Sequence, residues 1–217
     1  MKSGHIVFID NIDSFTYNLV DEFKQLGFAL EVYRNTIAAD VVIRRLEELA
    51  AQGPVILCLS PGPGHPSQAG CMPAVINYAR GRLPMLGICL GFQAMVELYG
   101  GEVDRCRETL HGKASLISCR PHPIFSGLDQ PLPVARYHSL QATRVPAELD
   151  IIANYEDIPM AIAHERDGVI GFQFHPESIM TTAGTELLKN SIHYLMNHSR
   201  TTPVSNAPAS TQGATHA

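Results

Sequence analysis

The sequence lacks the features that mark several classes of protein. It has no run of basic residues, and no apolar run is long enough to span a membrane. Its five cysteines are an odd number without a Cys-x-x-Cys pair, which argues against a disulfide framework. The N-terminus has no signal-peptide pattern, and a formal net charge of −5 argues against a nucleic-acid surface. These absences predict a cytoplasmic protein that binds neither nucleic acid nor a membrane.

Length and composition indicate an ordinary globular chain. It has 217 residues, of which 45% are hydrophobic, so it can bury a sizeable core. We expect one domain over residues 1–199. Residues 200–217 are mainly Thr, Ser, Ala, Pro, Gln and Gly, a composition that predicts a disordered tail. The histidines are scattered without metal-ligand spacing, so we expect neither a metal nor a cofactor in this chain.

Strand and helix patterns alternate in the first half of the chain. Apolar runs predict strands at 6–9, 29–33 and 55–59, and helical periodicity predicts helices after Asp13-Ser14 and over 40–52. This alternation is typical of a parallel sheet with helices on both faces, whose ligand site lies at the carboxyl ends of the strands. After Gly101, short segments predict strands at 102–106, 114–118, 134–140, 150–154, 160–164 and 169–174, followed by a helix over 184–197. The predicted class is therefore α/β: a central, mostly parallel sheet flanked by helices, with additional antiparallel strands in the second half.

One cysteine lies between two glycines at the end of an apolar run. The stretch Gly87-Ile88-Cys89-Leu90-Gly91 has the spacing of a nucleophile elbow, with Cys in the place of Ser. A sharp strand-to-helix turn requires glycine on both sides, because side chains there would collide with the turn. The turn also places sulfur at a helix N-terminus, where the thiolate is favoured. The alternative is a buried structural cysteine between packing glycines.

A second motif, Phe174-His175-Pro176-Glu177, supplies a base and a carboxylate. If this segment is extended, His175 and Glu177 project from the same face. A histidine that takes the thiol proton, oriented by a carboxylate, completes an activated cysteine nucleophile. An exposed polar pair near a strand end would explain His-x-Glu alone, but not its occurrence together with the elbow.

The loop Ser60-Pro61-Gly62-Pro63-Gly64 follows the predicted third strand. Because proline has no N–H, Gly62 and Gly64 are the amide donors of residues 61–64. One of these amides, with the amide of Leu90 after the nucleophile, could form an oxyanion hole. The alternative is a rigid Pro/Gly turn with no chemical role.

Together, the motifs at 61–64, 87–91 and 174–177 resemble a class I glutamine amidotransferase domain. The resemblance covers roughly residues 5 to 197, and it implies the flavodoxin-like fold of that family. It also implies a nucleophile Cys89, a base His175 and its orienter Glu177. The residues that it implies for binding glutamine are Gly62, Pro63, Gly64, Gln93, Ser139 and Leu140, and Leu90 with Gly62 would form the oxyanion hole. Members of this branch often have His where this chain has Phe92. This difference leaves open how efficiently the chain catalyses the reaction, but not the type of reaction.

Within the family, three further segments are similar to the small subunit of anthranilate synthase: 10–18, His111-Gly112-Lys113 and 136–140. The small subunit of aminodeoxychorismate synthase shares much of this pattern, so either product, or both, stays open. The resemblance implies that glutamine is hydrolysed to glutamate and ammonia, and that ammonia passes to a separate, large chorismate-using synthase subunit. Two other classes are a stand-alone cysteine hydrolase of glutamyl substrates and a non-catalytic ligand-binding protein. Segments 10–18 and 111–113 disfavour the first, and the coexistence of triad and glycine loop disfavours the second.

Overall fold

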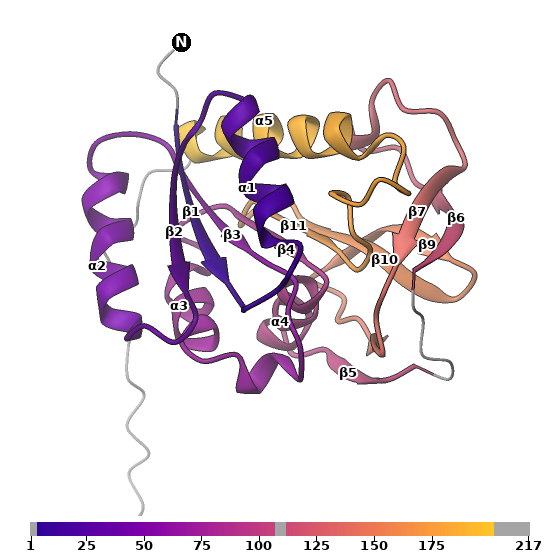
Figure 1. Ribbon diagram of the computed structural model, residues 1–217, viewed down its shortest axis with the longest axis horizontal. Helices are drawn as coiled ribbons and strands as arrows, with labels where there is room; N and C mark the ends of the chain where they lie inside the picture. Colours follow the sequence, from indigo (N-terminus) through magenta and orange to yellow (C-terminus); the bar gives the residue numbers. More distant parts are fainter. Residues whose placement is uncertain (1–3, 107–111, 202–217) are drawn as a thin grey trace, which may run out of the picture.

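A computed structural model describes residues 4–106 and 112–201 of the chain. Its main sheet has the strand order β2-β1-β3-β4-β11-β10-β9-β6-β7 (Figure 1). Five neighbouring strands are parallel: β2 (Ala29–Arg34), β1 (His5–Asp10), β3 (Val55–Leu59), β4 (Met85–Ile88) and β11 (Val169–Phe172). Four antiparallel strands extend the sheet: β10 (Ile158–His164), β9 (Asp150–Tyr155), β6 (Lys113–Cys119) and β7 (Leu132–Arg136). A separate antiparallel pair joins β5 (Glu102–Arg105) and β8 (Leu140–Arg144).

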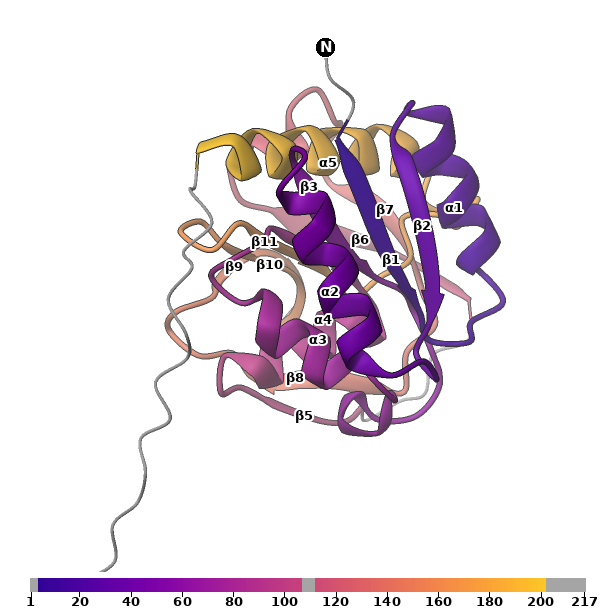
Figure 2. The same cartoon turned by 90° about the vertical axis from the view of Figure 1, so that its left-hand side faces the viewer.

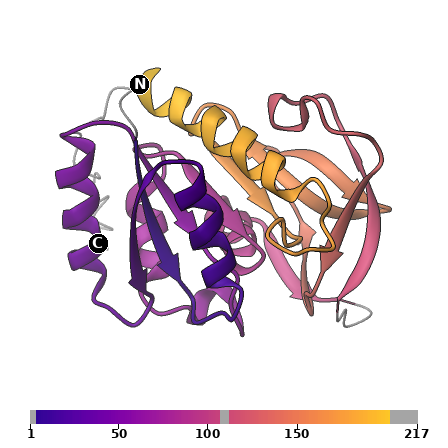
Figure 3. The same ribbon diagram turned by 45° about the horizontal axis from the view of Figure 1, so that its top comes forward.

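Helices cover both faces of the parallel strands, as Figures 1 and 2 show. One face packs against α1 (Thr16–Gln25) and α5 (Gly184–Thr201), and the other against α2 (Ala39–Ala50), α3 (Met72–Ala79) and α4 (Leu90–Leu98). Short 3₁₀ turns, η1 (Pro66–Gln68) and η2 (Pro123–Phe125), complete the elements. In Figure 3 the antiparallel strands lie on the far side of α5 from β1 and β2. None of the described helices is long and apolar enough to cross a membrane.

Alternating apolar side chains along β1 divide the core into two layers. Ile6 and Phe8 belong to the layer under α1 and α5, whereas Val7 and Ile9 belong to the layer under α2, α3 and α4. All four side chains are fully buried, and each contributes roughly 1.5–3 kcal/mol of hydrophobic stabilisation. The central strands are therefore apolar on both faces, which explains why short apolar runs in the sequence predicted parallel strands.

The predicted α/β class and the mixed sheet are confirmed, but several element boundaries are wrong. The expected strand over 134–140 is two strands, β7 and β8, which belong to different sheets and are separated at residues 137–139. Helix α3 was not predicted, because it is short and has Pro73 in its first turn. The strand expected over 169–174 ends at Phe172, and the last helix continues to Thr201. Most of the expected disordered tail, residues 202–217, lies outside the described residues.

Helix α1 begins at Thr16, shortly after the Asp13-Ser14 pair that marked its expected start. Phe15 occupies the N-cap position and makes no side-chain cap bond. Asp13 instead accepts a 2.7 Å hydrogen bond from the Phe15 amide, one residue before the helix proper. Asp10, at the end of β1, accepts from the hydroxyl of Thr16 at 2.8 Å. The segment between β1 and α1 is thus held by two carboxylates at the carboxyl edge of the sheet.

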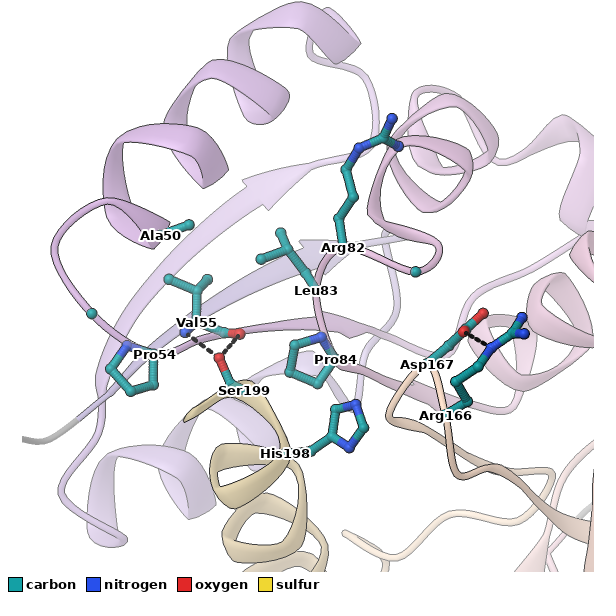
Figure 4. Close-up of a pocket in the computed structure, with 12 residues that line it drawn as sticks. Ala50, Pro54, Val55, Arg82, Leu83, Pro84, Arg166, Asp167, His198 and Ser199 are labelled. Atoms are coloured by element: carbon teal, nitrogen blue, oxygen red, sulfur yellow. Dashed lines mark hydrogen bonds and ion pairs between the residues drawn. The ribbon is translucent and has the colours of Figure 1, made fainter. Parts of the chain in front are cut away.

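A cavity of about 260 Å³ lies at the opposite edge, where β3 and β4 begin (Figure 4). Its walls include Pro54 and Pro84 before those strands and His198 and Ser199 near the end of α5. Ser199 accepts a 3.3 Å hydrogen bond from the Val55 amide at this edge. The cavity contains none of the residues expected to bind glutamine, which follow the carboxyl ends of the strands.

Candidate active site

Cys89 occupies a strained turn between β4 and α4. It is the N-cap of α4 and has φ 51° and ψ −97°, a conformation that residues with a side chain rarely adopt. Its amide donates a 2.7 Å hydrogen bond to the carbonyl of Phe172, and its carbonyl accepts from the Gln93 amide at 3.0 Å. Pairing with β11 and the first turn of α4 therefore fix the cysteine backbone from both sides.

The two glycines of the elbow are required by close backbone contacts. A Cβ atom on Gly91 would lie 2.6 Å from the carbonyl oxygen of Leu59 in β3. A Cβ atom on Gly87 would lie 2.6 Å from the backbone carbonyl carbon of Gly91. Such contacts are far shorter than van der Waals separation. The backbone of Leu59 would therefore collide with a side chain at position 91, and the backbone of Gly91 with one at position 87.

The first helical amide after the cysteine is available as a donor. The N–H of Leu90 has no acceptor within the described residues, as expected at a helix N-terminus. The N–H of Gly62 likewise has none there. A Cβ atom on Gly62 would lie 3.0 Å from Cδ2 of Leu90, so the loop 61–64 lies directly against the start of α4. The two amides expected to form an oxyanion hole belong to adjoining segments.

The glycine loop is held by the segment that follows β1. A Cβ atom on Gly62 would lie 2.5 Å from Cβ of Asn11, which leaves no space for a side chain. Asn11 is buried, and its backbone and side chain donate to Ser60 Oγ at 2.8 Å and to the Ser60 carbonyl at 3.0 Å. Asn35 donates to Asn11 Oδ1 at 3.2 Å. The position of the loop is therefore set by Asn11, at the start of the segment 10–18.

His175 and Glu177 form a buried pair. The Nδ1 atom of His175 lies 2.7 Å from Oε1 of Glu177, and the carboxylate is fully shielded from solvent. The segment is a turn rather than the expected extended strand, because the Ser178 amide donates to the His175 carbonyl at 3.3 Å. Glu177 reaches the imidazole across this turn.

Burial and hydrogen bonding act in opposite directions on His175. Burial lowers the pKa of the imidazole, whereas hydrogen bonding and charge interactions with Cys89 and Glu177 raise it, and the net pKa is about 10. The cationic imidazolium therefore persists at neutral pH. Oε2 of Glu177 is buried without a hydrogen-bond donor in the described part of the chain. The neighbouring imidazolium offsets part of the cost of this buried carboxylate.

Hydrogen bonds and aromatic rings hold His175 in place. Thr181 Oγ1 donates to the His175 carbonyl at 2.7 Å and accepts from the Ala135 amide at 3.0 Å. The ring centroids of Phe15 and Tyr137 lie 5.5 Å and 5.2 Å from the imidazole centroid. These rings come from the entry to α1 and from the break between β7 and β8. Segments far apart in sequence therefore exclude water from one side of the imidazole.

Gln93 links the elbow helix to the other expected glutamine-binding segment. Its Nε2 donates to the carbonyl of Leu140 at 3.1 Å. The same carbonyl lies 2.9 Å from Nδ1 of His138, whose Nε2 accepts from Arg136 Nε at 3.2 Å. Burial, and then the Arg136 charge, lower the pKa of His138 to about 4, so it is neutral and donates from Nδ1. The Leu140 carbonyl thus has two donors.

The remaining expected residues lie at the periphery of this arrangement. The carbonyl of Ser139 accepts from the Cys106 amide at 2.8 Å, and Pro63 and Gly64 are exposed at the tip of their loop. His111 lies outside the described residues. Phe92 is fully buried on the opposite face of the sheet from Cys89, where it packs against Gly171. At this position, where members of the branch often have His, the Phe92 side chain therefore packs in the core and does not line the site.

The sequence analysis missed three residues that contact the expected triad. Phe15 and Thr181 gave no signal of a contact with the triad, because their roles depend on segments brought together only by the fold. Gln173 gave one: its side-chain Nε2 lies 3.8 Å from Cys89 Sγ, and it precedes His175 by two positions. The alternation used to place His175 beside Glu177 would also have placed Gln173 on their face.

Comparison with known proteins defines the class. The family model described as glutamine amidotransferase class-I matches residues 7–195. The chain therefore belongs to the class I glutamine amidotransferase family, which confirms the resemblance seen in the motifs.

Curated relatives identify a particular branch. Anthranilate synthase component 2 of Vibrio parahaemolyticus is 53% identical over 193 residues, covering 89% of this chain and 97% of that protein. The protein of the same name from Haemophilus influenzae is 47% identical over 195 residues, covering 89% and 99%. The homologue of that name from Helicobacter pylori is 45% identical over 190 residues, covering 88% and 97%.

Solved structures share the fold at lower identity. A protein from Thermoplasma acidophilum, described as one subunit of a GMP synthase, has a TM-score of 0.77 at 22% identity, covering 92% of this chain and 98% of that one. A glutamine amidotransferase from Thermotoga maritima has a TM-score of 0.69 at 14% identity, covering 90% and 99%.

Proposed function

We propose that this chain is the glutaminase subunit of anthranilate synthase. The observation that carries the proposal is the joining of Cys89, in a strained elbow, to the buried pair of His175 and Glu177 within a class I glutamine amidotransferase. The branch is supported by relatives named anthranilate synthase component 2 that match this chain over nearly their whole length. The substrate is glutamine, and the products are glutamate and ammonia.

In the first half-reaction the Cys89 sulfur attacks the side-chain carbonyl carbon of glutamine. The amides of Leu90 and Gly62, which have no acceptor in the described residues, stabilise the negative oxygen that forms. His175 is an imidazolium at neutral pH and protonates the departing nitrogen. The C–N bond breaks, ammonia leaves, and a thioester joins the glutamyl group to sulfur.

In the second half-reaction water cleaves the thioester. His175, now neutral, removes a proton from water as the oxygen attacks the carbonyl carbon. The C–S bond breaks, glutamate leaves, and the cysteine sulfur and the imidazolium are restored. Glu177 keeps the imidazole oriented in both half-reactions, since its 2.7 Å contact occupies Nδ1 and leaves Nε2 for the chemistry.

Ammonia is then used by a partner chain. The relatives that match this chain are named component 2 of anthranilate synthase, a name that implies at least one other component. We therefore propose a heteromeric complex with a large subunit that converts chorismate to anthranilate. Direct transfer keeps ammonia neutral, because exposure to water would protonate it.

The test is steady-state glutamine hydrolysis by the purified chain, alone and then titrated with the large subunit, with and without chorismate. We expect weak hydrolysis by the chain alone, since an always-active site would release ammonia to water. We expect activation by the complex and anthranilate as the product. About 1.4 kcal/mol of preferential binding to the active conformation is enough for a tenfold effect.

Other outcomes identify the alternatives. Equal kcat/KM under all three conditions would indicate a stand-alone hydrolase. Aminodeoxychorismate as the product would assign the chain to the related synthase. Absence of glutamine hydrolysis under every condition, with Cys89 intact, would contradict the proposal itself.

A further inference from the structure

Gln173 is a polar side chain in a fully buried position. It follows β11 directly, is 0% exposed, and donates its backbone amide to the Met160 carbonyl at 2.9 Å. A buried amide side chain is costly unless its donors and acceptor are used. The amide oxygen and the amide nitrogen of this side chain both have hydrogen-bond partners, and both partners belong to the candidate site.

The orientation of Gln173 follows from the hydrogens available on Gln93. An amide NH₂ group has two hydrogens. On Gln93 one goes to the Leu140 carbonyl at 3.1 Å, and the other goes to Oε1 of Gln173 at 3.2 Å. The oxygen of Gln173 therefore faces Gln93, and its Nε2 must face the sulfur of Cys89, at 3.8 Å.

We propose that Gln173 is a further catalytic residue, which donates an N–H to the Cys89 sulfur and connects that sulfur through Gln93 to the Leu140 carbonyl. The inference rests on the proposed function, since Cys89 is there the nucleophile and Gln93 and Leu140 hold glutamine. The donor stabilises the sulfur when it is a thiolate, before attack and again when the thioester is cleaved. It joins the helix N-terminus and His175 as a third stabilising group.

A neutral amide suits this position better than a charged group. A carboxylate of the same shape would repel the thiolate and could not donate to it when ionised. A methionine of similar length would fill the space without offering a hydrogen. Because Gln93 keeps the amide of Gln173 from rotating, the donor stays directed at sulfur throughout the reaction.

The test measures the sulfur itself, without glutamine. Iodoacetamide alkylates the full chain between pH 5 and 10, and mass spectrometry follows the Cys89 peptide separately from the peptides of the other four cysteines. We expect Gln173→Met to move the midpoint of the pH–rate profile upward by about one pH unit, which makes alkylation about tenfold slower at pH values below the wild-type midpoint. Gln173→Glu should move it further, and Gln93→Met less, since that change only frees the Gln173 amide to rotate.

Controls separate this role from general destabilisation. Ser191→Ala removes a buried 2.7 Å hydrogen bond to the Leu187 carbonyl in α5, and it should leave the Cys89 profile unchanged. Melting curves establish that each variant is folded, and if Gln173→Met is not, the isosteric Gln173→Glu serves in its place. A Gln173 profile identical to wild type in a folded variant would overturn the proposal.

Glutamine turnover then separates the two levels of inference. Under the proposed function, Gln173→Met should lower kcat for glutamine about tenfold with little change in KM, because the donor acts on sulfur rather than on bound glutamine. A shifted alkylation profile in a protein that hydrolyses no glutamine would sustain the role of Gln173 and overturn the function. Normal glutamine hydrolysis by wild type, together with an unshifted alkylation profile of the Gln173 variant, would sustain the proposed function and overturn the role of Gln173.

Discussion

The nucleophile and the base are positioned by different means. Cys89 belongs to the parallel half of the sheet, where backbone geometry fixes it: a positive φ, two flanking glycines, and one hydrogen bond to Phe172. His175 lies where that half meets the antiparallel half, and side chains fix it. Glu177 and Thr181 bind it, and aromatic rings cover it.

This difference sets the kind of change that each side tolerates. On the cysteine side a single added methyl group meets main-chain atoms, which cannot move away without disturbing a strand. On the histidine side the supporting groups are side chains, so removal of one leaves the others in place. We therefore expect abrupt losses from the first side and graded losses from the second.

The largest effect should come from the reacting groups, because Cys89 and His175 act together in one mechanism. Cys89→Ala and His175→Ala should each lower glutamine hydrolysis by roughly 10⁴-fold or more, and the double variant should lose little beyond either. Steady-state hydrolysis by the complex with the large subunit measures this. Independent, multiplying losses would contradict a shared mechanism. Synthesis supplied with ammonia should survive all three changes in the assembled complex.

Gly91→Ala should destabilise the fold by about 3 kcal/mol or more, because its Cβ would lie 2.6 Å from the Leu59 carbonyl oxygen. Urea denaturation measures the free energy of unfolding. Gly53→Ala is the matched control: nothing lies within 4 Å of a Cβ atom there, and its φ is not positive. Equal stability of the two variants would show that the elbow accommodates a side chain.

Thr181→Val should have a smaller effect, near 2 kcal/mol, because it leaves the Ala135 amide and the His175 carbonyl without their shared partner. Hydrolysis should fall about tenfold as His175 becomes less well placed. Thr182→Val changes an exposed neighbour and should be nearly neutral in both assays. A loss confined to the Thr182 variant would disprove this support for the base.

A further prediction concerns the pH dependence of stability. The pKa of His175 is raised from its ordinary value of 6.5 to about 10, so its contribution is fully present below pH 6.5 and is lost as pH rises through 10. The free energy of unfolding of wild type should therefore approach that of His175→Gln between pH 6 and pH 10. Urea curves at pH 6, 8 and 10 measure the gap. A constant or widening gap would contradict the buried imidazolium.

The sequence was most informative where function requires local rules. Glycines flanking Cys89 and the His-Pro-Glu sequence are short-range signals, although His175 and Glu177 meet across a turn and not along an extended strand. Apolar runs predicted the parallel strands because both faces are buried. The break at Tyr137 was missed, since it depends on two sheets competing for neighbouring segments. Phe15 and Thr181 were missed for a related reason: each meets His175 only through tertiary packing, which no spacing encodes.

The hydrogen bond from the Cys89 amide to the Phe172 carbonyl also has a consequence for the synthesis of the polypeptide on the ribosome. Cys89 and Gln173 are 84 positions apart, so the ribosome makes the nucleophile long before the strand that anchors it. Until β11 enters the sheet beside β4, the cysteine has neither its last ladder bond nor its base. Hydrolytic competence therefore requires a long-range pairing, and a nascent chain that ends before β11 would contain the Cys89 thiol but no active site.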